Sequence, residues 1–274
     1  MECPNCGCER SLVVSRKYLV TTLRRCDNCN LLFRVPTSKK KEQVKFYQNE
    51  YSQGFTTDVP TRETLELLKR TKFHGTEKDF SGYIKVLEAL GCKSGVRVFD
   101  YGCSWGYGSW QMQEAGYRVS AFEISVPRCN YAKNYLGIEA AHSLEGISGP
   151  VDVFFSAHVI EHVFSVRELV DLAKTFVKPG GLFVAFCPNG SEEFMKKDRR
   201  SWNLLWGMVH PNFLDKHFLG KLFERNSYLL ATTPYDLREI NKWSQFSEKS
   251  SELNLNGREL MIVVKRSQDN NGNF

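Results

Sequence analysis

No stretch of the 274-residue chain is apolar over the roughly 20 residues that a membrane-spanning helix requires. The first residues, Met-Glu-Cys-Pro, also lack the basic start and the apolar run of a secretory signal. From these two absences we expect a cytoplasmic protein with no membrane partner, whose nine cysteines stay reduced.

Net charge is absent from most of the chain. Residues 1–41 hold nine of the 37 Lys and Arg residues and only three of the 31 Asp and Glu residues, and the remaining 28 of each sign cancel. A protein that binds nucleic acid usually presents a continuous basic track. The composition therefore confines any such contact to the N-terminal segment.

Four of the cysteines form two CxxC pairs that are separated by 19 residues, namely Cys3 with Cys6 and Cys26 with Cys29. Each pair places two thiolates on one side of a tight turn, and two such turns make a tetrahedral zinc site. We therefore predict a zinc ribbon over residues 1–37, with a structural ion because four protein ligands leave no open position. Two alternatives stay open: Cys8 in place of Cys6 as a ligand, and cysteines with a redox role or none.

Two standard phosphate-binding motifs are missing from VFDYGCSWGYGSW, residues 98–110. A dinucleotide fingerprint needs glycine where this chain has Ser104 and Tyr107, and a Walker A loop needs a Gly-Lys-Ser/Thr sequence. The remaining pattern is Gly102-x-Ser104-x-Gly106, between an expected strand and an expected helix. Gly102 permits a tight turn, and Gly106 permits close approach of a ligand. We expect Ser104 either to avoid positive φ or to tolerate modest strain.

Strands and helices are predicted to alternate after Gly95. The expected strands are 96–100, 118–123, 138–141, 151–156, 181–187, 228–232 and 259–264, and the expected helices are 105–115, 126–135, 166–177 and 213–225. This alternation predicts a parallel sheet covered on both faces, with an antiparallel end where the last two strands follow one another. Residues 38–93 are expected to form an amphipathic helical linker, in which Tyr47 and Tyr51 either pack or cover a pocket.

The segment VFDYGCSWGYG resembles motif I of the class I S-adenosylmethionine-dependent methyltransferases, with Ser104 at the position of their third glycine. In that family the turn holds the methionine part of the cofactor, and an acid after the second strand bonds both ribose hydroxyls. Glu123, which lies 23 residues after Asp100, matches this acid. A carboxylate suits the role because its two oxygens can accept from two vicinal hydroxyls. VDVFFSAHVIEHV and FVKPGGLFVAFCPN resemble the fourth and fifth strands of the family.

The resemblance implies a Rossmann-like, seven-stranded α/β sheet with helices on both faces, in a methyltransferase domain over residues 94–274. It also implies that S-adenosylmethionine is held by Asp100, Tyr101, Gly102, Cys103, Ser104, Gly106, Glu123, Ile124, Ala157 and His158. We expect the hydroxyl of Ser104 to bond the carboxylate of the cofactor, and His158 to line the cofactor through its backbone.

Methyl transfer to a hydroxyl or a carbon acid usually needs a base. His162 follows the fourth predicted strand, at the carboxyl edge where such sheets bind ligands, and an ordinary imidazole pKa of about 6.5 suits a base. We predict that His162 is the general base, that Glu161 orients it or binds a substrate hydroxyl, and that His210 contacts substrate. In the alternative, Glu161 and His162 merely begin a helix.

The chain also resembles a narrower group of methyltransferases that combine an N-terminal CxxC…CxxC ribbon, a Tyr-xxx-Tyr segment and a Glu-His-Val motif. Such enzymes act in the biosynthesis of sugars, surface polysaccharides and other small metabolites. The resemblance implies a small-molecule acceptor such as a sugar or nucleotide-sugar, with Trp202 and Trp206 either stacking on it or lying in the core. The alternatives are a ribosomal RNA base methyltransferase that docks through the basic ribbon, and a non-catalytic binding protein.

Overall fold

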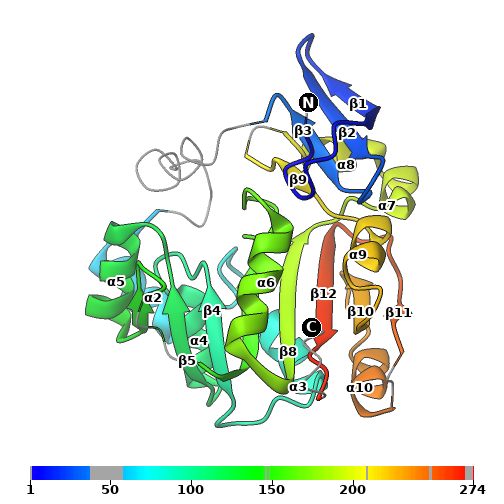
Figure 1. Cartoon of the computed structure of the whole chain (residues 1–274). Helices are drawn as coiled ribbons and strands as arrows, with labels where there is room; N and C mark the ends of the chain where they lie inside the picture. The colour runs from blue at the N-terminus through cyan, green and yellow to red at the C-terminus, as the bar shows by residue number, and fades with distance from the viewer. Residues whose placement is uncertain are drawn as a thin grey trace. The chain divides into compact units, whose positions relative to one another are not determined.

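The computed structural model describes residues 2–37, 58–145, 147, 149–207, 209–246, 249–268 and 274, as Figure 1 shows. The chain forms two compact units. Unit 1 comprises Met1–Lys40, Ser156–Tyr235 and Ser247–Phe274, and unit 2 comprises Lys41–Phe155 and Asp236–Phe246. Each unit therefore combines segments that are far apart in the sequence. The domain boundaries expected after residues 37 and 93 stay predictions, and Tyr47 and Tyr51 lie outside the described residues.

Unit 2 contains parallel strands in the order β7-β4-β5-β6. They are β4 (Arg97–Tyr101), β5 (Arg118–Phe122), β6 (Glu139–Ala141) and β7 (Val151–Ala157), of which β7 runs on into unit 1. Val98 pairs with Val119 on one side and with Val153 on the other. Parallel strands require crossovers, which α4 (Tyr107–Glu114) and α5 (Val126–Leu136) provide.

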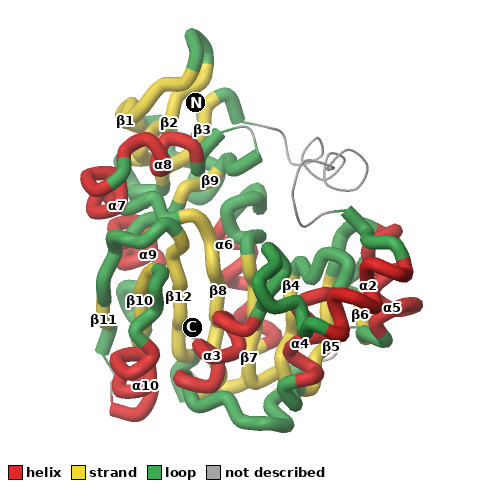
Figure 2. Tube along the Cα trace, turned by 180° about the vertical axis from the view of Figure 1, so that it is seen from behind, coloured by secondary structure: helices red, strands yellow, loops and turns green. Residues whose placement is uncertain are grey.

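Three further helices complete unit 2: α2 (Arg62–Arg70), α3 (Ser81–Ala89) and α10 (Leu237–Phe246). Thr61 caps α2, because its side chain accepts a hydrogen bond from the backbone N–H of Thr64. The side chain of Ser244 in α10 donates to the carbonyl of Leu90 at the end of α3, at 2.7 Å. Figure 2 shows α3 and α4 on the near face of the strands of this unit.

Unit 1 contains strands in the order β11-β10-β12-β8. They are β8 (Val177–Pro188), β10 (Ser227–Thr232), β11 (Ser251–Glu252) and β12 (Glu259–Lys265). β12 is antiparallel to both β8 and β10, so the predicted antiparallel end is confirmed. Residues 260–264 of β12 are all buried, as expected for a strand that is apolar along its length. The helix α6 (Val166–Phe176) lies over β8 in Figure 1.

A second sheet in unit 1 includes the N-terminal segment. Its order is β1-β2-β3-β9, with β1 (Ser11–Lys17), β2 (Thr21–Cys26), β3 (Leu32–Val35) and β9 (Asn212–Phe213). The helix expected over 213–225 therefore begins only at Lys216, as α9 (Lys216–Leu222), because Asn212 and Phe213 pair with β3. The N-terminal strands thus complete their sheet with residues that lie nearly 180 positions later.

A shared apolar core joins this second sheet to α7 (Glu192–Lys197) and α8 (Arg199–Leu204). Trp202 and Trp206 are 2% and 1% exposed, and Trp202 lies 5.1 Å from the ring of Phe213. Of the two roles expected for these tryptophans, the structure therefore shows the core role, since a buried ring cannot stack on a substrate. The pattern had not indicated α7, α8, α10, β9 or β11.

Candidate functional site

The glycine-rich turn, residues 102–106 and here called the cofactor turn, follows β4 in unit 2. Gly102, Ser104 and Gly106 have φ values of 88°, 53° and 89°, all in the left-handed region. Ser104 therefore tolerates strain rather than avoiding it, the second of its two expected conformations. A left-handed L-residue costs roughly 1–2 kcal/mol.

Glu123 is tied to the cofactor turn through backbone amides. The amide of Ser104 donates to Oε2 of Glu123 at 2.9 Å, and the amide of Ser125 donates to Oε1 at 2.8 Å. Burial raises the pKa of Glu123, although the amides and the charge of Arg128 oppose the effect. A carboxylate oxygen can accept more than one hydrogen bond, so each oxygen can also accept from a ribose hydroxyl.

Asp100 lies next to the last residue of β4 and has a buried carboxyl group. The hydroxyl of Ser109, from α4, donates to its Oδ2 at 2.6 Å. Burial raises the pKa of Asp100 to about 7, against the lowering effect of that hydrogen bond. The sequence had not indicated Ser109, whose only signal was its place in the helix that the turn begins.

Other residues expected at the cofactor turn have packing roles. The ring of Tyr101 stacks between those of Phe122 and Phe154, at centroid distances of 5.0 and 5.4 Å. Cys103 is buried in a cluster with Trp105. A Cβ on Gly106 would lie 2.8 Å from that of Ala132 in α5, so this glycine permits close helix packing as well. Ile124 is half-buried between Glu123 and α5.

Glu161, His162 and His210, here called the His cluster, come together in unit 1. Nε2 of His162 lies 3.8 Å from Oε1 of Glu161, and the two imidazole centroids are 4.7 Å apart. One ligand atom from each of the three residues lies within 4.8 Å of the others. The structure therefore brings together all three residues that were predicted to be catalytic. Since α6 begins only at Val166, Glu161 and His162 lie in a turn and do not begin that helix.

Backbone carbonyls orient both imidazoles of the His cluster. Nδ1 of His162 lies 2.5 Å from the carbonyl oxygen of Val209, and Nδ1 of His210 lies 2.6 Å from that of Leu205. A carbonyl oxygen can only accept, so Nδ1 carries the proton in each neutral ring and Nε2 carries the lone pair.

The charges of the His cluster follow from its burial. Burial lowers the pKa of His162 to about 4 even though Glu161 opposes this, so the ring is neutral near pH 7. For Glu161, burial opposes ionisation, but the neighbouring imidazoles outweigh it and lower the pKa to about 2. The cluster therefore combines a buried carboxylate with the lone pair of the neutral His162 imidazole.

Two residues that were expected to line the cofactor lie in unit 1, where Ala157 ends β7 and His158 follows it. His158 has a φ of 56°, and its Nε2 lies 2.7 Å from Oε2 of Glu259, whose Oε1 accepts from the hydroxyl of Tyr235 at 2.6 Å. Burial would lower the pKa of His158, but Glu161 and Glu259 outweigh it and raise it to about 10. No sequence signal had indicated Glu259 or Tyr235, and the cofactor roles of His158 and Ala157 stay predictions.

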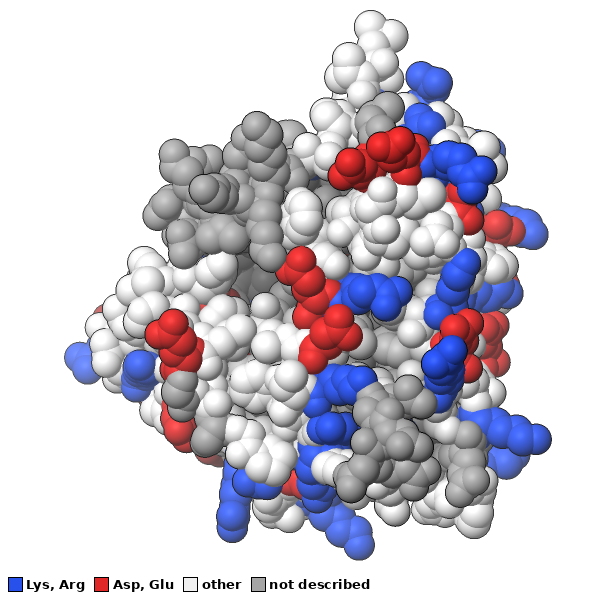
Figure 3. Space-filling model, in the orientation of Figure 1, with Lys and Arg blue, Asp and Glu red and all other residues white. Residues whose placement is uncertain are grey.

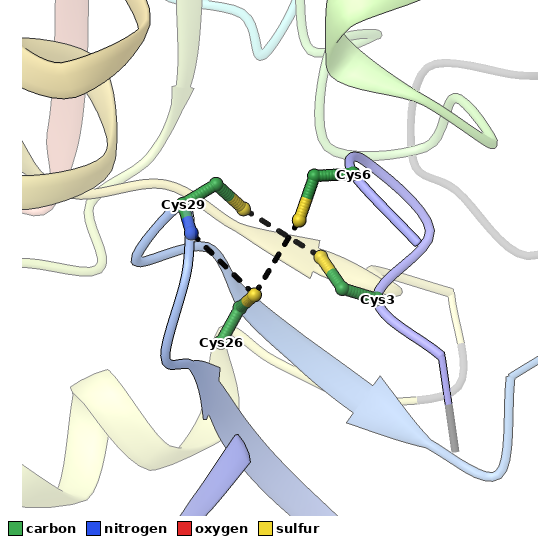
Figure 4. Close-up of side chains that lie close together, drawn as sticks. All are labelled: Cys3, Cys6, Cys26 and Cys29. Carbon is green, nitrogen blue, oxygen red and sulfur yellow. Dashed lines mark hydrogen bonds between the residues drawn. The ribbon is translucent and has the colours of Figure 1, made fainter. Parts of the chain in front are cut away.

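The four CxxC cysteines point toward one another, as Figure 4 shows. The sulfurs of Cys3 and Cys29 are 3.6 Å apart, as are those of Cys6 and Cys26. These separations are far longer than the roughly 2.05 Å of a disulfide. Ligands about 2.3 Å from a tetrahedral zinc would be about 3.8 Å apart, so the set fits that ion. Cys8 is not in the group, and its thiol instead faces the carbonyl of Arg10.

Comparison with known proteins decides the family. A family model described as a methyltransferase domain matches residues 76–230, more than half of the chain. The chain belongs to this methyltransferase family. The methyltransferase is 31% identical over 100 residues to the ubiquinone biosynthesis O-methyltransferase of Methylocella silvestris and 30% identical over 100 residues to that of Caulobacter sp.. These alignments cover 33% of this chain, and the chain spans 39% and 40% of the two relatives.

Solved structures show the fold. The plantazolicin methyltransferase BamL matches with a TM-score of 0.54 and 12% identity, over 83% of this chain and 95% of that chain. A Clostridium acetobutylicum S-adenosylmethionine-dependent methyltransferase matches at 0.50 and 10%, over 75% and 98%. The predicted Rossmann-like fold, with a mixed sheet and helices on both faces, is confirmed. The predicted number of seven strands was wrong, because β11 pairs with β10 as a further strand.

The methyltransferase is an enzyme that uses S-adenosylmethionine, so the reading as a non-catalytic binding protein is set aside. In the part of the chain that the structure describes, no helix combines the length and the apolar character needed to span a membrane.

Proposed function

We propose that the methyltransferase methylates a hydroxyl or a carbon acid of a small molecule, of the sugar, nucleotide-sugar or related biosynthetic class. The observation that carries this proposal is the His cluster, which offers a neutral, half-buried imidazole whose Nε2 lone pair lies beside a buried carboxylate. The relatives named ubiquinone biosynthesis O-methyltransferase favour a small-molecule acceptor, because their names specify methylation of an oxygen in a metabolite pathway.

In this proposal the cofactor turn and Glu123 hold S-adenosylmethionine. The carboxylate of Glu123 accepts from the ribose hydroxyls while Ser104 and Ser125 keep it in place through their amides. The hydroxyl of Ser104 donates to the carboxylate of the cofactor. Asp100, which accepts a hydrogen bond from the hydroxyl of Ser109, is the second acidic group of the proposed cofactor site.

His162 is then the general base. Bound S-adenosylmethionine would supply the methyl group to the acceptor and leave as S-adenosylhomocysteine. Nε2 of His162 takes the proton that the acceptor loses. Glu161 stabilises the imidazolium that results, since its carboxylate lies 3.8 Å from Nε2. His210 contacts the acceptor from the other side of the cluster.

We further infer that the ribbon cysteines Cys3, Cys6, Cys26 and Cys29 hold a structural zinc ion. Four thiolates close the coordination sphere, so the ion would hold the CxxC turns together and take no part in the transfer. Elemental analysis of the chain purified without added zinc tests this, with one zinc per chain expected and that ion lost after Cys29→Ser.

The ribbon also bears on the alternative acceptor, RNA. Arg25 pairs with Asp215 at 2.8 Å, and Lys17 donates to the carbonyl of Trp206, so both cations are engaged within unit 1. On the face shown in Figure 3, acidic and basic side chains are interspersed. Both observations count against the continuous basic track that RNA docking requires.

The test is transfer of radiolabelled methyl from S-adenosylmethionine into sugars, nucleotide-sugars, other small metabolites and total RNA. We expect label in small, nuclease-resistant material, and much less of it with His162→Asn. Label in ribonuclease-sensitive polymer would contradict the proposal and would assign the ribbon to RNA docking.

A further inference from the structure

We propose that Glu161, His162 and His210 form a second metal site, which binds a divalent ion of the zinc class through one carboxylate oxygen and two Nε2 atoms. This site is distinct from the cysteine ribbon. Ion binding itself does not depend on the proposed function, but its expected effect on turnover rests on that function.

The ligand set is the first argument. Two imidazoles and one carboxylate are the protein ligands of several catalytic zinc sites, and they leave at least one position open. One ligand atom from each of the three residues lies within 4.8 Å of the others, and Nε2 of His162 lies 3.8 Å from Oε1 of Glu161. Ligands about 2.0–2.1 Å from a tetrahedral ion would be about 3.3 Å apart, so binding requires a contraction of about 1.5 Å at most.

The orientation of the rings is the second argument. Imidazoles that bind metals usually donate the proton on their other nitrogen to a carbonyl or carboxylate. Both rings do so here, to the carbonyls of Val209 and Leu205. With Nδ1 facing a carbonyl in each ring, Nε2 is the nitrogen left to bind an ion.

The buried carboxylate is the third argument. Glu161 is 1% exposed, and neither oxygen accepts a hydrogen bond of good geometry from a described residue. Its Oε1 lies 3.5 Å from Nδ1 of His158 and 3.8 Å from Nε2 of His162. The His158 imidazole is shared with a second carboxylate, that of Glu259. A bound cation would give the buried Glu161 oxygens the partner that the described residues do not provide, in a setting where an unpaired polar group is costly.

The backbone around the His cluster is held in place by β9, the strand that also pairs with β3 of the N-terminal sheet. The amide of Asn212 donates to the carbonyl of Glu161 at 3.2 Å, and its side-chain nitrogen donates to the carbonyl of Val163 at 2.6 Å. The amide of Arg34 in β3 donates to the carbonyl of Pro211 at 2.8 Å. The two ligand-bearing segments are therefore held in place by residues of β9 and β3, as a preorganised site requires.

Zinc would compete with catalysis at His162, because Nε2 has one lone pair and cannot bind an ion and accept a proton at once. We therefore expect added zinc to inhibit methyl transfer reversibly.

The experiment is zinc binding to the full-length chain by equilibrium dialysis at micromolar free zinc, followed by elemental analysis. We expect two ions per chain for the unmodified protein and one for His210→Gln and for Glu161→Gln. The matched control is His217→Gln, an exposed histidine of α9 outside the cluster, which should keep both ions. One ion in the unmodified chain, or two in His210→Gln, would overturn the proposal.

Cobalt(II) provides a second measurement that does not depend on how the variants fold. Cobalt at the ribbon gives thiolate charge-transfer absorption, whereas cobalt at the His cluster gives only ligand-field bands, since that site has no sulfur. A second equivalent that adds ligand-field bands alone supports the site, and a titration that ends with the thiolate bands overturns it. If zinc binds at the His cluster and turnover requires it, the metal site stands and the assignment of His162 as base fails.

Discussion

The cofactor turn of unit 2 and the His cluster of unit 1 both follow a strand, yet the buried carboxylates at the two places have different hydrogen-bond partners. Both oxygens of Glu123 accept backbone amides from residues at most 19 positions away. Glu161 is equally buried, but its oxygens accept no good hydrogen bond from a described residue and face imidazoles instead. The turn is thus completed by its own segment, whereas the cluster is left with unused acceptors, a state that proteins rarely keep without a functional reason.

The largest effect should come from His162→Asn, which removes the proton acceptor and leaves the cofactor turn intact. General base catalysis typically contributes about 10²–10⁴-fold, so we expect kcat to fall within that range. The affinity for S-adenosylmethionine, measured by calorimetry, should stay unchanged. A variant that keeps its turnover would show that His162 is not the general base. The functional difference between the His cluster and the cofactor turn would then have no support.

The pH dependence of kcat tests the same assignment of His162 as the general base. Because burial lowers the pKa of His162 to about 4, the neutral base is fully present above about pH 5 and is lost only as the pH falls through 4. The acid limb of kcat should therefore lie near pH 4. A limb near the ordinary imidazole pKa would show that another group, or an imidazole in a wetter setting, accepts the proton.

Arg25→Ala should destabilise unit 1. The substitution leaves Asp215 without the guanidinium that lies 2.8 Å away. Asp215 is fully buried, and burial raises the pKa of its carboxyl group. Removing one partner of a buried ion pair typically costs about 3–5 kcal/mol, and urea unfolding would measure the loss. Since Arg25 is partly exposed, we expect the lower end of that range. Arg24→Ala is the control, because Arg24 donates to the hydroxyl and the carbonyl of Ser11 and not to a buried carboxylate. Equal losses in the two variants would contradict the special role of the ion pair.

Glu123→Ala should weaken cofactor binding and spare the His cluster. Loss of two charged hydrogen bonds to the ribose, at about 1.5–3 kcal/mol each, predicts at least a ~100-fold rise in the Kd for S-adenosylmethionine. Glu114→Ala, at an exposed position of α4, should leave the Kd unchanged. Equal affinities in the two variants would show that the cofactor does not use Glu123.

Ser104 provides the smallest change. Ser104→Gly relieves the left-handed strain but loosens the unfolded chain, so we expect stability to change by less than about 1 kcal/mol. Ser104→Ala keeps the strain and removes the same hydroxyl. If that hydroxyl bonds the cofactor, both variants should bind S-adenosylmethionine about 10-fold more weakly. Unchanged affinity in both would make Ser104 a tolerated substitution.

The predicted strands of the parallel region agree closely with the structure, because a buried strand and the glycines that end it are local features. Residues 118–123 and 151–156 were expected as strands, and the structure has Arg118–Phe122 and Val151–Ala157. The helix expected from 213 was wrong at its start, since Asn212 and Phe213 pair with β3. Helical periodicity was present there, but a partner strand far away in the sequence took the first residues.

The sequence by itself determined the strand–turn–helix order, the left-handed glycines of the cofactor turn and the pairing of cysteines into two knuckles. Each of these depends on residues that are near neighbours in the chain. Only the tertiary structure decided that His210 lies beside His162 and that Arg25 pairs with Asp215. It also decided that Glu259, to which Tyr235 donates, contacts His158. These contacts join residues between 24 and 190 positions apart, so no local pattern in the sequence could indicate them.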